Sequence, residues 1–334
     1  MSTIGQTAFT LNDWKTRMNL DGTVADIVEV LAQSNPIMDH VLWKQGNLLT
    51  GNRVTQRSSI MEPGTRRINE GAKIIKSGTK QNTDTVVHFE AFSQLDEQAY
   101  DIAPDGDALR MSEDKAAIEG FGNKFARTLI YGDPAAATDE FAGLATRMAK
   151  IGSDKPTDAG YTVVSAGGSS ANAQTSAYFV EWGDVQTYGI FPRNGKAGLE
   201  MDDKGLEKMT DEQGNIYYAY LTQFTWDVGL TVADPRTAGA LRNIEPNILI
   251  SGTAAQKLAF WSNLLTVHDR MRHPEKCKLY VGATLFTALK VFLSDKNNSY
   301  VTYDTLANGI KQLYVDGIPV FRLDAIRNDE PVIV

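Results

Sequence analysis

Apolar residues recur at helical spacing in the stretch SEDKAAIEGFGNKFARTLIY, residues 112–131. Residues three, four and seven positions apart lie on one side of a helix. Here that side predicts a buried face formed by Ile118, Phe121, Phe125 and Leu129. Ser112 is the predicted N-cap, and Gly132-Asp133-Pro134 is the predicted end. About 20 residues at roughly 1.5 Å per residue make a rod of about 30 Å. We expect this helix to be the spine on which the sheets pack.

Residues 44–92 have a different pattern, with few large apolar residues and many Gly, Thr and Asn. Residues 53–57 (RVTQR) alternate in polarity, and residues 85–89 (TVVHF) form a second strand-like segment thirty residues further on. Together they predict a long two-stranded ribbon with a flexible tip. Because an isolated ribbon is marginally stable in water, we expect it to lie against another surface.

Residues 1–22 are polar apart from a few isolated apolar side chains, namely Phe9, Leu11, Trp14 and Met18. This pattern fits a disordered tail, or an arm that becomes ordered only when those side chains meet a partner surface. Residues 23–34 predict a short amphipathic helix that ends at Asn35-Pro36. Since no apolar run reaches signal-peptide length or the roughly 20 residues of a membrane span, we expect a soluble protein of cytosolic origin.

The second half of the chain alternates between strand and helix patterns without a regular βαβ period, which favours an α+β fold. Residues 176–192 predict two buried strands around a turn at Gly183-Asp184, and residues 193–214 a charged excursion. Further segments are predicted as strands at 216–232 and 279–281, helices at 253–270 and 283–293, and a hairpin whose strands 312–315 and 318–323 flank Asp316-Gly317.

Charge separates the predicted ribbon from the rest of the chain. The 334 residues carry a net charge of −8, and one segment, residues 44–80, has eight basic and two acidic residues. That segment is therefore +6 and the remainder −14. A solvated loop and a nucleic-acid arm are alternatives, but no aromatic residue stands between positions 45 and 87 to stack on bases. A basic strap lying on the acidic body of a neighbouring copy explains both the charge and the missing core. Its expected contact residues are Arg53, Arg57, Arg66, Arg67, Lys73, Lys76 and Lys80.

Motifs for catalysis, cofactors and metals are absent from the sequence. Residues 189–197 resemble a phosphate loop, but five residues separate the glycines and Ala197 replaces the required Ser or Thr. Residues 101–112 fail the calcium-loop pattern, and no zinc-protease helix, nucleophile elbow or dinucleotide fingerprint occurs. The single cysteine, Cys277, could pair with His273, although a buried structural thiol is favoured. We therefore expect no catalytic, cofactor or metal site, and a structural protein.

A series of short motifs resembles the major capsid proteins of tailed bacteriophages. Each is weak alone, but together they run in order over roughly residues 40–330. They are RRINEG (66–71), KSGT (76–79), RMSEDK (110–115), TLIYGD (128–133), FAGLATR (141–147), WGD (182–184), GIFP (189–192), KAGL (196–199), TQFTWDVGL (222–230), GIPV (317–320) and DAI (324–326).

This resemblance implies the tailed-phage and herpesvirus capsid fold, of the Hong Kong 97 type. It assigns an N-terminal arm to residues 1–43, an extended loop to 44–92, a peripheral domain with the spine helix to 93–150, and mixed axial and peripheral segments to 151–334. In some relatives the Gly-Ile-Pro hairpin precedes the strand that holds the WGD motif, whereas here it comes last.

The implied function is a major capsid protein that self-assembles through pentamers and hexamers into an icosahedral shell around phage double-stranded DNA. The subunit would be made in the bacterial cytoplasm, with separate scaffolding and portal proteins as partners and cement proteins as a further option. The packaged DNA would lie nearby without being bound specifically, and no membrane is involved. Two other classes stay open: a hydrolase with an unrecognised site, and a nucleic-acid-binding protein that uses residues 44–80.

Overall fold

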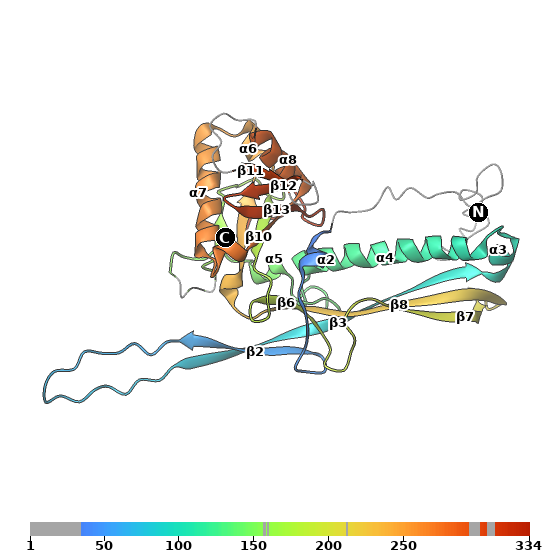
Figure 1. Ribbon diagram of the computed structural model, residues 1–334, viewed down its shortest axis with the longest axis horizontal. Helices are drawn as coiled ribbons and strands as arrows, with labels where there is room; N and C mark the ends of the chain where they lie inside the picture. Colours follow the sequence, from blue (N-terminus) through green and yellow to red (C-terminus); the bar gives the residue numbers. More distant parts are fainter. Residues whose placement is uncertain (1–34, 156–157, 159, 212, 294–300, 306–310) are drawn as a thin grey trace. The chain divides into compact units, whose positions relative to one another are not determined.

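The computed structural model describes residues 35–155, 158, 160–211, 213–293, 301–305 and 311–334, and its helices and strands are labelled in Figure 1. The chain divides into two compact units. Among the described residues, the first unit contains those within 88–125 and 197–227, and the second contains those within 35–87, 126–196 and 228–334. Three elements run from one unit into the other, namely α4 (Gly106–Tyr131), β3 (Gly78–Asp96) and β8 (Ile216–Val232).

The first unit packs α4 against a small sheet. β8 pairs antiparallel with β7 (Glu200–Thr210) and lies next to β3, which leads into α3 (Glu97–Ile102). Alternate residues of β8 face the helix, since side chains alternate along a strand. The rings of Phe224 and Phe121 lie 6.2 Å apart, and those of Trp226 and Phe125 lie 4.8 Å apart. These aromatic contacts attach α4 to the sheet of the first unit.

The predicted spine helix is confirmed, but it begins at Gly106 rather than at Ser112 and contains 26 residues. The side chain of Asp105 accepts a hydrogen bond from the Ala108 N–H at 2.9 Å. This contact satisfies one of the free N–H groups of the first turn. Asp105 therefore takes the capping role that we had given to Ser112, which lies inside the helix.

Three of the four predicted core residues of this helix are buried: Phe121 is 7% exposed, and Phe125 and Leu129 are 0% exposed. The prediction for Ile118 was wrong, because 45% of its surface is exposed. Ile118 lies only about 20° around the helix from Phe125, so the difference is not one of face. From Phe125 onward α4 is covered on several sides, as the buried Ala126, Thr128 and Ile130 show, whereas around Ile118 the helix residues Lys115, Ala116 and Gly120 are exposed.

The predicted ribbon exists, with strands β2 (Gly51–Ser59) and β3. Its register differs from the expectation, because Arg53 lies opposite Thr83 and Arg57 opposite Thr79. Residues 85–89 belong to β3 but lie beyond the residues that pair with 53–57. β3 has 19 residues and holds β2 on one side and β8 on the other. Its polar first half forms the ribbon, and its apolar second half belongs to the sheet under α4.

This first sheet has the strand order β1-β6-β8-β3-β2, with β7 also on β8. The strands and helices not yet delimited around it are α2 (Ile37–His40), β1 (Trp43–Gln45), α5 (Leu144–Arg147), β6 (Thr187–Phe191) and the 3₁₀ turn Pro235–Thr237.

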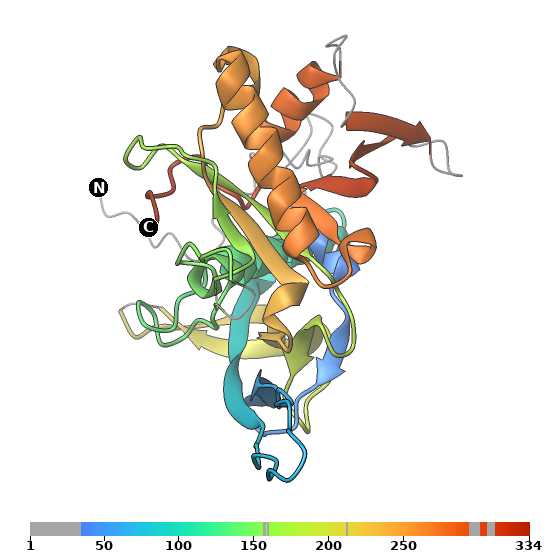
Figure 2. The ribbon, with the colours of Figure 1, turned by 90° about the vertical axis from the view of Figure 1, so that its left-hand side faces the viewer.

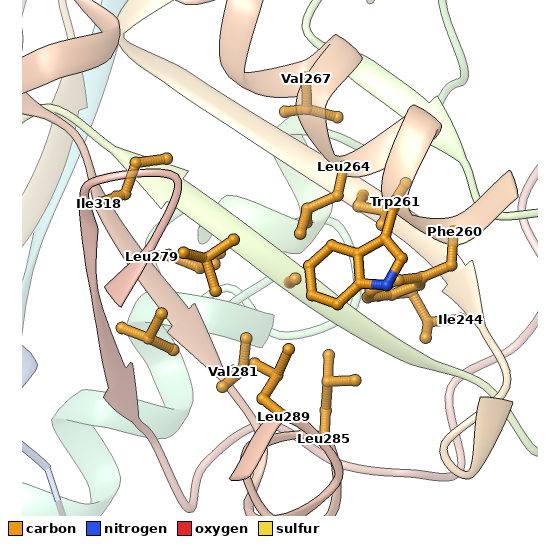
Figure 3. Packing of buried hydrophobic residues seen from close by; sticks show 14 of the residues in the cluster. Ile244, Phe260, Trp261, Leu264, Val267, Leu279, Val281, Leu285, Leu289 and Ile318 are labelled. Carbon is orange, nitrogen blue, oxygen red and sulfur yellow. The ribbon is translucent and has the colours of Figure 1, made fainter. Parts of the chain in front are cut away.

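A seven-stranded sheet forms the centre of the second unit, in the order β11-β12-β13-β10-β5-β9-β4. Its helices, α6, α7 and α8, enclose an apolar core with it. Figure 2 shows α7 along this sheet, and Figure 3 shows Trp261, Leu264, Leu279 and Leu285 meeting in that core. The bounds are β4 Val163–Ser165, β5 Thr175–Val180, β9 Ala238–Ile244, α6 Ile248–Ser251, α7 Ala254–Arg270, a 3₁₀ turn at Pro274–Lys276, β10 Lys278–Val281, α8 Ala283–Phe292, β11 Val301–Thr305, β12 Lys311–Val315 and β13 Ile318–Arg322.

Local signals predicted several of these elements correctly. The hairpin β12–β13 turns at Asp316 and Gly317, whose φ angles of 49° and 79° are those of a type I′ turn. Helix α7 begins at a capping box, in which Thr253 and Gln256 exchange hydrogen bonds. Two other predictions were incomplete. The two strands in 176–192 are both buried but lie in different sheets, and the charged excursion at 193–214 contains the strand β7.

Candidate functional site

The loop between β2 and β3, residues 60–77, is the most exposed part of the second unit. All seven predicted contact residues lie on this hairpin and are exposed, which places their charges in solvent. They are Arg53, Arg57, Arg66, Arg67, Lys73, Lys76 and Lys80. We name residues 60–77 the strap. In a single copy the strap presents its basic side chains without burying them, so they are available to a partner surface.

Exposed isoleucines are a feature of the strap that sequence reasoning missed. Ile60 is 81% exposed, Ile68 92% and Ile74 96%. Isolated exposed apolar residues are common on protein surfaces, but here several lie within one basic loop. The signal was present in the sequence, because isolated apolar residues in a polar stretch had suggested an ordering arm at residues 1–22. The strap therefore offers both charge and apolar area.

Buried polar contacts hold the base of the strap. The Arg147 guanidinium donates to the Asp84 carboxylate at 2.6 Å and to the Leu230 carbonyl at 3.0 Å, and Asp84 is 8% exposed. The Asn52 amide donates to the Tyr188 hydroxyl at 2.9 Å. Breaking a buried hydrogen-bonded ion pair is costly, because it leaves an uncompensated charge. The last residue of the FAGLATR motif therefore anchors β3, and the hairpin projects from a fixed base.

Arg110, the first residue of the RMSEDK motif, connects α4 with two strands of the first unit. Its guanidinium donates to the Asp203 carboxylate in β7 and, at 2.9 Å, to the Thr222 hydroxyl in β8. This hydrogen bond from Arg110 lowers the pKa of Asp203 below its usual value. Arg110 thus helps to hold β7, whose residues are almost all exposed, beside the helix.

A buried polar cluster in the second unit joins the end of α4 to the seven-stranded sheet. The Glu330 carboxylate accepts hydrogen bonds from Ser176 and Tyr131 and lies 3.5 Å from the Arg242 guanidinium. Burial, and next the charge of Glu330, raise the pKa of Tyr131. Glu330 and Arg242 are each 4% exposed, so the cluster is structural rather than an accessible site.

The thiol of Cys277 has the properties of a structural residue, as the sequence favoured. It is 2% exposed and donates to the His273 carbonyl, whereas the His273 ring lies 2.8 Å from the Glu181 carboxylate. Burial raises the pKa of Cys277 to about 12, which keeps the thiol protonated and unreactive. Among the described residues no cluster of His, Cys, Asp and Glu could hold a metal ion, and no described helix is long and apolar enough to cross a membrane.

Two predictions fall outside the described residues. They are the arm anchors Phe9, Leu11, Trp14 and Met18, and the amphipathic helix at 23–34.

Solved structures of two phage proteins match this fold over most of the chain. A chain of bacteriophage Epsilon15, determined by cryo-electron microscopy, is 27% identical and matches with a TM-score of 0.75 over 100% of this chain and 99% of its own. A chain of the bacteriophage JBD30 capsid matches with a TM-score of 0.54 at 12% identity, over 90% of this chain and 95% of its own. The chain therefore has the fold of tailed-phage capsid structures, which confirms the predicted fold class.

The chain belongs to the family described as Major capsid protein GP7, whose model matches residues 19–334. No curated protein matches it. The chain is therefore a major capsid protein of a tailed-phage head shell and a component of the virion, and it is a structural protein rather than an enzyme. The predicted resemblance and function are confirmed, and the hydrolase alternative is excluded.

Proposed function

We propose that this subunit forms the pentamers and hexamers of an icosahedral shell, and that its strap, residues 60–77, reaches over a neighbouring copy. The observation that carries the proposal is the strap itself. It combines exposed basic side chains with isoleucines that are up to 96% exposed, on a hairpin whose base is fixed by buried contacts. In an isolated subunit these side chains stay in solvent, whereas on a second copy of the same chain they can be buried and paired.

The domain assignment is part of this proposal. Residues 1–43 form the arm, residues 44–92 the extended loop, and residues 93–150 the peripheral domain with α4 as its spine. Residues 151–334 supply the axial domain and the remaining peripheral segments. The strand order supports this division, because β2 and β3 form the loop while the seven-stranded sheet lies entirely within residues 163–322.

Apolar burial and charge contribute differently to the strap contact. Covering one isoleucine stabilises a contact by about 1.5–3 kcal/mol, whereas one exposed ion pair contributes about 0–1 kcal/mol. The isoleucines therefore provide most of the affinity, and the charges orient the strap and make its binding depend on salt. Each contact is weak, but the shell repeats it in every subunit.

Other components of the particle complete the proposal. Scaffolding and portal proteins would be separate chains, and cement proteins could bind the finished shell. Packaged DNA would lie close to the shell without specific binding. The net charge of −14 outside residues 44–80 is consistent with that, because an acidic surface repels phosphate.

Charge reversal in the strap tests this function. The variant Arg66→Glu with Arg67→Glu and Lys73→Glu should fold but assemble poorly, because the change acts at every equivalent contact. The matched control is Arg66→Lys with Arg67→Lys, which keeps the charge and should assemble normally. Salt above roughly 0.5 M shortens the electrostatic screening length to a few ångströms. Such salt should therefore weaken the assembly of the wild-type protein too.

Particle yield, measured by sedimentation and electron microscopy, decides between the strap and its alternative. Normal shells from the triple variant would contradict the strap. Normal empty shells that fail only to package DNA would instead favour the nucleic-acid reading of residues 44–80.

A further inference from the structure

The apolar pattern of the ribbon does little to fix how β2 aligns with β3. β2 contains one large apolar residue, Val54, which is partly buried, and the residues that it faces in β3, residues 79–83, are all polar. A slip of two residues would keep every side chain on its own face, because side chains alternate along a strand. Strands that are polar on both faces are prone to such slips. Particular contacts must therefore set the alignment.

One cross-strand pair of the ribbon is both polar and buried. Asn52 lies directly opposite Asp84, and these residues are 5% and 8% exposed. Each has partners of its own in the second unit. The Asp84 carboxylate accepts from Arg147 at 2.6 Å, while the Asn52 amide donates to the Tyr188 hydroxyl at 2.9 Å and accepts from the Asn47 N–H at 3.3 Å. Both strands are thus fixed at the same level of the ribbon.

A close approach of the two backbones adds a steric restriction beside this pair. A Cβ atom at Gly51 would lie 2.0 Å from the Asp84 carbonyl oxygen. A slip of β2 by two residues would bring Leu49 or Arg53 to this position, and the Cβ of either would collide with that oxygen. Glycine is therefore required here, and its position in β2 is compatible with a single alignment.

Gln56 makes the other polar contact of β2 on this face. Its amide donates to the Ala233 carbonyl at 2.8 Å and accepts from Asn82 at 2.9 Å. These groups are only partly buried, so water can replace a lost partner. The contacts of Gln56 are therefore less selective for alignment than those of the buried Asn52.

We propose that Asn52 and Asp84, together with Gly51, form a register lock that selects the alignment of β2 with β3 and thereby positions the strap for assembly. Buried polar groups can specify alignment where apolar contacts do not, at a cost in stability. The inference deepens the proposed function, because it concerns how the strap is presented to a neighbouring copy. The three residues are positioning residues, since Asn52 and Asp84 are buried within their own subunit.

The size of a slip explains why alignment matters for assembly. Two residues of a strand span about 7 Å, whereas an ion pair requires its charged atoms within about 4 Å. A slipped β2 would therefore carry the basic residues at its end of the strap out of reach of their partners. Since a shell repeats the same contact in many subunits, slipped copies would be excluded from it or would stop its growth.

Disulfide formation between engineered cysteines can report the alignment. Thr55 and Gln81 are opposite each other and exposed. The Val86 N–H donates to the Thr50 carbonyl, so the 50–86 pair is hydrogen-bonded, and by alternation the 55–81 pair is not. Side chains of such a pair are close, so Thr55→Cys with Gln81→Cys should oxidise readily in the native alignment.

Two further cysteine pairs report slips in either direction. They are Thr55→Cys with Thr83→Cys, and Thr55→Cys with Thr79→Cys. In the native alignment these are diagonal neighbours about 7–8 Å apart, which is too far for a disulfide. The natural Cys277 is 2% exposed and does not compete.

The lock variant is Asn52→Leu with Tyr188→Phe. It removes both partners of a buried hydrogen bond and keeps most of the side-chain volume, a change that is close to neutral for stability. In free subunits the yield of a slipped cross-link relative to the native one should rise roughly tenfold or more, the factor that one or two lost hydrogen bonds allow. The matched control, Lys80→Leu, makes a polar-to-apolar change at an exposed position of the same ribbon and should leave the ratio unchanged.

An unchanged ratio in the folded lock variant would overturn the register lock. It would leave the strap proposal intact, because the measurement uses free subunits. If circular dichroism shows the lock variant to be unfolded, Tyr188→Phe alone takes its place. This variant removes one hydroxyl, and a slipped fraction equal to that of wild type would again overturn the lock.

Rescue of assembly separates positioning from a merely structural role. The lock variant should give few particles, and oxidising the Thr55→Cys with Gln81→Cys pair in that variant should restore the yield, because the disulfide fixes the native alignment. Continued failure with the disulfide formed would overturn the positioning role. Normal particles from subunits whose ribbons are slipped would instead contradict the proposed function of the strap.

Discussion

Replacing Phe125 by Ala removes an aromatic contact between α4 and β8. Phe125 is 0% exposed, and its ring centroid lies 4.8 Å from that of Trp226. Truncating a buried Phe to Ala costs about 3–5 kcal/mol, because apolar contacts are lost and a cavity is left behind. The total stability of a domain is about 5–15 kcal/mol. We therefore expect the variant to be largely unfolded at elevated temperature and to yield insoluble or unassembled protein.

Denaturant unfolding of free subunits measures this loss. Trp226 is 5% exposed and its ring lies against that of Phe125, so it adds a local signal to the fluorescence of the five tryptophans. The matched control is Ile118→Ala in the same helix. Because Ile118 is 45% exposed, its truncation should cost about 1 kcal/mol or less. Equal unfolding midpoints for Phe125→Ala and wild type, together with normal particles, would refute the packing of α4 on β8.

The remaining predictions concern the buried cluster, one histidine and the arm. Glu330→Gln leaves the buried Arg242 without its carboxylate and should lower the free energy of unfolding by about 3–5 kcal/mol. The control, Asp329→Asn at the exposed neighbouring position, should change it by about 0.5 kcal/mol or less. Equal effects of the two variants would contradict the structural role of the cluster. Burial is the main reason that the pKa of His40 falls from 6.5 to about 4. The unfolded chain then binds the proton first, so stability should fall as pH drops from 6.5 toward 4, and less steeply in His40→Gln. Residues 1–20 should be cleaved by protease in free subunits and protected in particles; equal cleavage would mean that they bind no partner surface.

Local sequence signals were enough to predict several helices, strands and turns of this protein. The long apolar period of α4, the aromatic strand β8 and the Asp316-Gly317 turn were predictable, because each depends on residues close together in the chain. The charge of residues 44–80 was also enough to single out the strap. The order of short motifs indicated the capsid family, which the match over residues 19–334 confirms.

Only the tertiary structure decided which elements meet. The polar half of β3 pairs with β2 in the ribbon, and its apolar half lies beside β8 in the sheet. This division depends on the two neighbouring strands, β2 and β8, and not on the pattern of β3 alone. The strand β7 looked like a charged loop because both of its faces are exposed. Ile118 shares the helical period of Phe125 but is 45% exposed, since the burial of a position depends on what lies over it. The contact of Arg147 with Asp84 joins residues 63 positions apart, and pairings at such distance leave no local pattern in a sequence.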